Sequence, residues 1–183
     1  MIYALLLVPF CAGVLAFIIR NDAARRRLLV SAAWLHAALT ALCAADLLLG
    51  GSLSAALPGW AQGVSVWFAF DPLGMVFLCI TSVLFLGASH YAVAYLASEK
   101  RDPGEDSDDG FIFNNAPEAV FTGCLLLFLA AMTAVTSSRH MGLLWASVEA
   151  TTLLSAPLIY FHRTRRSLEA TWKYLLICSV GIA

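Results

Sequence analysis

The sequence is poor in charged residues. Only 13% of its 183 residues are Asp, Glu, Lys or Arg, whereas 61% are hydrophobic and the mean hydropathy is +0.81. Soluble domains are nearer to half apolar and a quarter charged. The composition therefore argues against a soluble domain and indicates a protein embedded in lipid.

Metal-binding, disulfide and nucleic-acid signatures are also lacking. The five cysteines lie singly inside apolar runs without a CxxC spacing, which argues against disulfides and zinc and predicts buried apolar side chains. The net charge of −1 comes without the basic stripe that nucleic-acid binding requires. The acidic stretch 99–110 lacks the spacing of a calcium loop. We therefore expect no metal, cofactor or nucleic acid to bind this chain.

Long apolar runs are what the sequence does contain. About 20 apolar residues in a helix cover the ~30 Å hydrocarbon core of a bilayer. Because lipid admits only helices and closed barrels, these runs predict an all-α, polytopic transmembrane helix bundle. We expect five complete spans and an incomplete sixth, at residues 2–19, 28–50, 72–97, 118–137, 141–161 and 168–183.

The distribution of Lys and Arg predicts how these spans are oriented. Nine of these residues lie in the loops 20–27, 98–117 and 162–167, whereas the alternate loops contain only Arg139. Basic loops remain in the cytoplasm, so the N-terminus is expected outside. The first apolar run lacks a positively charged segment before it, which predicts an uncleaved membrane helix. We expect one membrane domain, residues 1–183, in the inner (plasma) membrane.

One carboxylate, Glu149, lies near the middle of the predicted fifth span. An ionised carboxylate facing lipid is costly, so Glu149 must face protein or water, or stay protonated. We predict that it faces inward and takes up and releases protons. A protonated acid that is only hydrogen-bonded to a neighbouring helix is the alternative. Helical spacing predicts that its face also contains Gly142, Trp145, Thr152, Leu153, Ala156 and Tyr160.

Lys173, in the predicted sixth span, is a candidate partner for Glu149. It lies six residues after Ser167, which is about 9 Å along a helix. Two interpretations are open. Lys173 either extends to the cytoplasmic interface and pairs with Glu169, four residues before it, or it approaches Glu149, directly or through water, and tunes its proton affinity.

Three further polar residues lie within or beside the predicted spans. Asp71 immediately precedes Pro72, where a helix N-cap is expected. His36 and His90 lie on neighbouring spans, each about 12 Å from the cytoplasmic face. Two histidines at one level allow a haem with two histidine ligands. Hydrogen-bonded core histidines and members of a proton path are the commoner roles.

The C-terminal two thirds of the chain resembles a known superfamily. The segments VEATTL, SLEATWKY and ICSVGIA resemble the fifth and sixth helices of the antiporter-like membrane subunits. These subunits occur in respiratory complex I, Mrp-type sodium/proton antiporters and membrane-bound hydrogenases, and hydrogenase-4 component F looks most similar. FDPLG followed by SHYAVAYL resembles their third helix. The similarity covers roughly residues 67–183, and the first two helices agree only in position and hydrophobicity.

The resemblance implies that Glu149 corresponds to the family's fifth-helix glutamate, a proton-loading site, and that Lys173 corresponds to its sixth-helix lysine. In the family the glutamate works with a lysine on a broken seventh helix, which these residues do not include. The resemblance further implies helices one to three and a cytoplasmic loop in residues 1–117. Residues 118–183 would begin the first antiporter-like repeat, so the chain is expected to be an N-terminal fragment or a truncated protein.

We therefore expect a proton- or sodium-translocating subunit without its own redox chemistry. Its partners would be other membrane subunits of a respiratory-type oxidoreductase, either a membrane-bound hydrogenase or a complex I-like assembly. Two alternatives remain open. One is a truncated structural subunit without transport, and the other is a membrane cytochrome with haem between His36 and His90.

Overall fold

The computed structural model describes residues 2–49, 54–55, 67–99 and 116–182. Nearly all of these residues are helical, as the sequence predicts. Two short strands, β1 (Ser54–Ala55) and β2 (Phe68–Ala69), pair antiparallel and join Ser54 to Ala69. The helices are α1 (Ile2–Ile18), α2 (Asp22–Leu48), α3 (Pro72–Glu99), α4 (Glu118–Ser137), α5 (Met141–Ile159) and α6 (Arg165–Ile182).

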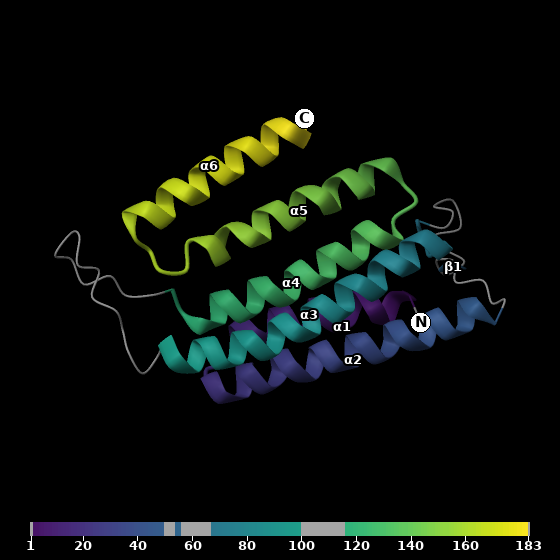
Figure 1. Cartoon of the computed structure of the whole chain (residues 1–183), viewed down its shortest axis with the longest axis horizontal. Helices are drawn as coiled ribbons and strands as arrows, with labels where there is room; N and C mark the ends of the chain where they lie inside the picture. The colour runs from purple at the N-terminus through teal and green to yellow at the C-terminus, as the bar shows by residue number, and fades with distance from the viewer. Residues whose placement is uncertain (1, 50–53, 56–66, 100–115, 183) are drawn as a thin grey trace.

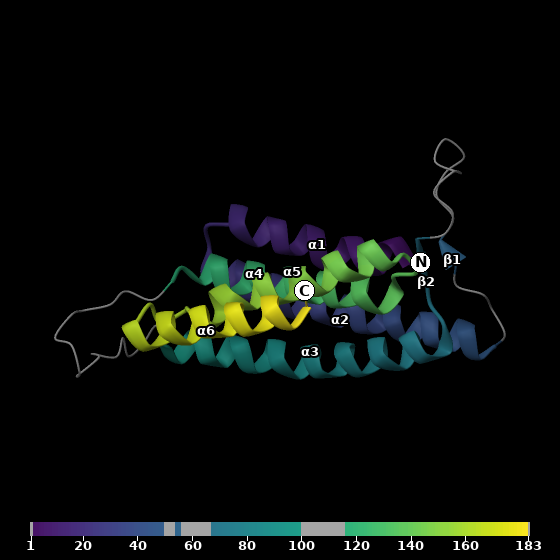
Figure 2. The same ribbon diagram turned by 90° about the horizontal axis from the view of Figure 1, so that it is seen from above.

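The helices lie roughly side by side along the long axis of the molecule (Figures 1 and 2). Helix α4 is central, because it packs against α1, α2, α3 and α5. Helix α6 packs on the outer side of α5 and forms one edge of the bundle (Figure 1). Successive helices run in opposite directions, so the α1–α2 and α5–α6 connections lie at the same end (Figure 1).

Four helices, α2, α3, α4 and α5, are long and apolar enough to cross a membrane. This confirms an all-α, multi-pass membrane protein. Helix α1 is apolar but has 17 residues, and α6 contains Arg165, Arg166, Glu169 and Lys173 among its 18 residues. Helix α1 is therefore too short, and α6 too charged, to be counted with the four helices that can cross a membrane.

Helix α2 begins earlier than the sequence predicts. Residues 22–27, expected in a cytoplasmic loop, form its first turns. The side chain of Asn21 accepts a hydrogen bond from the backbone N–H of Ala23 (3.0 Å) and so caps the helix. The length of the apolar run alone places the start of α2 too late, because a capped helix can extend beyond the hydrocarbon core through charged residues.

Helices α1 and α4 cross in close contact at two glycines. A Cβ atom on Gly123 would lie 2.5 Å from the ring of Phe17, and one on Gly13 would lie 2.8 Å from the side chain of Leu127. Small residues allow helix backbones in lipid to approach closely, where van der Waals packing stabilises their association. The contact fixes α1 against the central helix.

Candidate functional site

Glu149 lies on α5 and is half-buried. It is the only charged residue of this helix. Within the part of the chain that the structure describes, its carboxylate has no hydrogen-bonding or ion-pairing partner. The nearby Thr152 hydroxyl donates instead to the backbone oxygen of Glu149 (2.7 Å). Helix α5 therefore presents a single unpaired carboxylate within an apolar segment that can cross a membrane.

The predicted inward face around Glu149 is only partly buried. Thr152 and Ala156 are buried, as expected, whereas Trp145 and Leu153 are more than half exposed. Gly142 is exposed as well, so the structure does not bury these three residues of the predicted inward face within this chain. Helix α5 receives contacts from α4 on one side and from α6 on the other, so part of its circumference stays uncovered.

Lys173 pairs with Glu169 in this structure. Its Nζ atom donates to Glu169 Oε1 at 2.5 Å, and the two side chains are 67% and 64% exposed. This is the first of the two arrangements that the sequence allows. The structure therefore does not bring Lys173 and Glu149 together.

The register between α5 and α6 indicates how far apart these two charges lie. The Ser155 and Tyr174 hydroxyls are hydrogen-bonded at 2.7 Å, which places Lys173 near the level of Ser155. Glu149 lies six residues closer to the N-terminus of α5 than Ser155, an axial offset of about 9 Å to which the lateral spacing of the two helices adds. Water or a rearrangement of side chains would have to bridge this distance.

His36 is the centre of a buried polar cluster that joins three helices. Its ring is 1% exposed. The Nε2 atom lies 3.0 Å from Thr133 Oγ1 of α4, and Nδ1 lies 3.0 Å from Ser82 Oγ of α3. Ser82 also hydrogen-bonds with Thr40, one turn from His36 on α2 (3.0 Å). Both ring nitrogens thus have hydroxyl partners, as in a core histidine that links helices.

His90 lies apart from this cluster. It is exposed, its Nδ1 atom lies 2.8 Å from the backbone oxygen of Leu86, and its ring packs edge-on against Trp34. The structure therefore does not pair His36 with His90, and the two rings do not form the ligand set of a haem. The described residues also contain no group of three His, Cys, Asp or Glu that could hold a metal ion.

Asp71 lies at the start of α3. Its Oδ1 atom accepts a hydrogen bond from the backbone N–H of Gly74 (2.9 Å). A Cβ atom on Gly74 would lie 2.7 Å from the backbone oxygen of Thr136 on α4. Asp71 therefore holds the first turn of α3 where that helix closely approaches α4.

An ion pair that the sequence did not reveal joins three helix ends. Arg26 of α2 binds Glu118 of α4 through two nitrogens, at 2.5 and 3.1 Å. The same guanidinium donates to the backbone oxygen of Leu96 on α3 (3.0 Å). The side chains of Arg26 and Glu118 are only 18% and 13% exposed, respectively. We call this arrangement the Arg26–Glu118 clamp.

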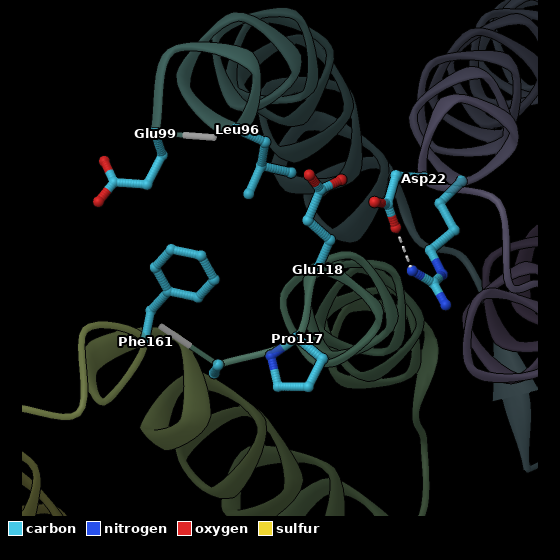
Figure 3. A pocket seen from close by; sticks show the side chains of 8 residues that line it. Asp22, Leu96, Glu99, Pro117, Glu118 and Phe161 are labelled. Carbon is cyan, nitrogen blue, oxygen red and sulfur yellow. Dashed lines mark hydrogen bonds and ion pairs between the residues drawn. The ribbon is translucent and has the colours of Figure 1, made fainter. Parts of the chain in front are cut away.

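A cavity of about 340 Å³ lies beside this clamp, between the ends of α2, α3 and α4 and the C-terminal end of α5. Figure 3 shows the carboxylates of Asp22, Glu99 and Glu118 around it. Asp22 pairs with Arg25 (2.5 Å), and Glu99 lies 3.5 Å from His162. With carboxylates and Arg25 among its lining residues, a cavity of this volume can hold several water molecules at the end of the bundle predicted to face the cytoplasm.

Comparison with known proteins places these features in context. No family model matches the chain. The chain is 28% identical over 117 residues to the hydrogenase-4 component F homolog of Methylacidiphilum infernorum (isolate V4). The match covers 64% of this chain but only 23% of that protein, so the chain spans less than a quarter of the curated relative that it matches. The resemblance to hydrogenase-4 component F found in the sequence is thereby confirmed as a similarity to a homolog of that protein.

Proposed function

We propose that the chain belongs to a proton- or sodium-translocating membrane subunit of a respiratory-type oxidoreductase complex, either a membrane-bound hydrogenase or a complex I-like assembly. The similarity to a hydrogenase-4 component F homolog supports this class of complex. The observation on which the proposal depends most is Glu149, an unpaired carboxylate, among the described residues, in a helix able to cross a membrane. Such residues are rare in membranes and mark ion paths.

The proposed topology has five complete spans, an incomplete sixth and an external N-terminus. At 1.5 Å per residue, the 17 residues of α1 extend about 26 Å, close to the thickness of the hydrocarbon core. The α1–α2 and α5–α6 connections lie at one end of the bundle (Figure 1), and the arginines of these connections and of the first turns of α2 and α6 support a cytoplasmic position for that end. We assign the protein to the inner (plasma) membrane, with residues 118–183 beginning an antiporter-like repeat.

In the proposed mechanism, Lys173 controls the charge of Glu149 from a distance. In the observed arrangement Glu169 holds the ammonium group on α6. An axial offset of about 9 Å combined with the about 9 Å spacing of packed helices puts the charges about 13 Å apart, where unit charges interact by about 1.3 kcal/mol at an effective dielectric constant of about 20. Moving the cation away from Glu169 toward Glu149 would therefore stabilise the carboxylate, and moving it back would favour proton uptake. The chain would contribute no redox chemistry of its own.

Transport by the assembled complex tests the proposal. The complex would be purified from its membrane, reconstituted into sealed vesicles and supplied with electron donor and acceptor. A pH-sensitive dye and a sodium-sensitive dye would report which ion accumulates, and an uncoupler would serve as the control. We expect one ion to move during turnover. Turnover without movement of either ion would instead support the structural alternative.

A further inference from the structure

A groove runs between α1, α4 and α5 on the side of the bundle away from the Arg26–Glu118 clamp. Its volume is about 620 Å³, and its lining is apolar except for Ser147. Five alanines line the space between the helices: Ala130, Ala131 and Ala134 on α4, and Ala146 and Ala150 on α5. If the groove were empty, the side chains that line it would lack van der Waals partners. We therefore expect an apolar group to occupy it.

The groove is slightly shorter than one leaflet of the hydrocarbon core. Its lining extends over residues 127–134 of α4 and 146–154 of α5. At 1.5 Å per residue these segments measure about 10–12 Å, whereas half of the hydrocarbon core is about 15 Å thick. The groove is therefore long enough to hold most of one acyl chain.

Charged and aromatic groups lie at the end of the groove nearest the α4–α5 turn. Phe68 lines the groove there, and the preceding residue, Trp67, accepts a hydrogen bond from the backbone N–H of Arg139 (2.9 Å). The Trp67 ring packs on the ring of His140 with their centres 5.8 Å apart. Arg139 and His140 are both exposed. Tryptophan is enriched at the level of lipid headgroups, and the backbone bridge between Phe68 and Ser138 sets Arg139 next to the groove at that level.

We propose that this groove binds an anionic phospholipid. One acyl chain lies between α1, α4 and α5, and the phosphate pairs with Arg139 at the α4–α5 turn. Charge complementarity favours this occupant over a transmembrane helix of a partner. In the described ranges Arg139 is the only Lys or Arg at this end of the bundle, and it follows Ser138, which bridges to Phe68 in the lining of the groove. A helix would fill the groove without requiring that charge.

Native mass spectrometry of the protein released from nanodiscs tests the proposal. The nanodiscs would contain equal amounts of phosphatidylglycerol and phosphatidylcholine. We expect the wild-type protein to retain one phosphatidylglycerol preferentially. Arg139→Gln removes the charge and is expected to lower this retention roughly fivefold, the effect of one basic residue near an anionic lipid surface. Ala146→Phe places a ring in the groove and is expected to abolish retention of the bound lipid.

Two matched variants control for general effects. Arg165→Gln removes an exposed arginine at the opposite end of the bundle, and Val83→Phe enlarges an exposed apolar residue of α3 outside the groove. Both are expected to retain phosphatidylglycerol as the wild type does. Equal retention of the two lipids by the wild type, or unchanged retention in either Arg139→Gln or Ala146→Phe, would overturn the proposal. Loss in Ala146→Phe without any headgroup preference would indicate a purely apolar occupant and would also overturn it.

Discussion

Replacing Glu149 with glutamine is expected to lower ion transfer by the assembled complex by roughly 100-fold or more, the range over which a positioned proton-transfer group acts. Glutamine has nearly the same size as glutamate and can still form hydrogen bonds, but it cannot ionise. Because Glu149 is the only charged residue of α5, no other side chain of that helix can take its place. Ion uptake into sealed vesicles during turnover, divided by the electron-transfer rate, measures the effect.

The matched control is Glu149→Asp, which keeps the carboxylate and shortens its side chain by one carbon. We expect this variant to retain much more transfer than Glu149→Gln, while both variants insert into the membrane at the wild-type level. Undiminished transfer in Glu149→Gln would remove Glu149 from the proposed path. Equal losses in both variants would indicate that the packing of α5, and not its carboxylate, is what matters.

The second large effect is expected at the Arg26–Glu118 clamp. Glu118→Ala leaves the guanidinium of Arg26 partly buried and without its carboxylate, because both side chains are less than one fifth exposed. Removing one partner of a buried ion pair commonly costs about 3–5 kcal/mol, and this partly buried pair is expected to lie near about 3 kcal/mol. Denaturation of the purified protein in mixed detergent micelles measures the free energy of unfolding.

A double variant separates the loss of the pair from the cost of an isolated charge. Arg26→Met combined with Glu118→Leu removes both charges and is expected to recover most of the stability that Glu118→Ala loses. The exposed pair on α6 provides the comparison, and Glu169→Gln should leave the free energy of unfolding unchanged within error. A double variant as unstable as the single one would show that the clamp stabilises through its geometry and not through its paired charges.

Apolar run length predicted the class of fold because the bilayer thickness sets the length of each helix. It predicted the ends of α5 to within two residues, since that run is bounded by polar turns. It placed the start of α2 too late, because Asn21 caps a helix whose first turns are charged. The sixth run was expected to be an incomplete span, and α6 does lie outside the four helices that are long and apolar enough to cross a membrane. Helix α1, expected as a complete span, also lies outside them because it has only 17 residues.

The polar contacts were less predictable, and their sequence separation explains why. The Lys173–Glu169 pair was foreseen as one of two arrangements because its members lie four residues apart on one helix. Arg26 and Glu118 lie 92 residues apart, and His36 and Thr133 lie 97 apart. Nothing in a single sequence assigns such partners, because the packing of α2 against α4 decides which polar groups meet.

Infrared difference spectroscopy of the assembled complex during turnover tests the central claim most directly. A protonated carboxyl group gives a distinct band, and Glu149→Gln identifies the contribution of Glu149 by removing it. We predict that this band gains and loses intensity as the complex turns over, and that Lys173→Met changes the fraction of time for which it is present. A Glu149 band that stays constant through turnover, or that responds identically with and without Lys173, would contradict the account.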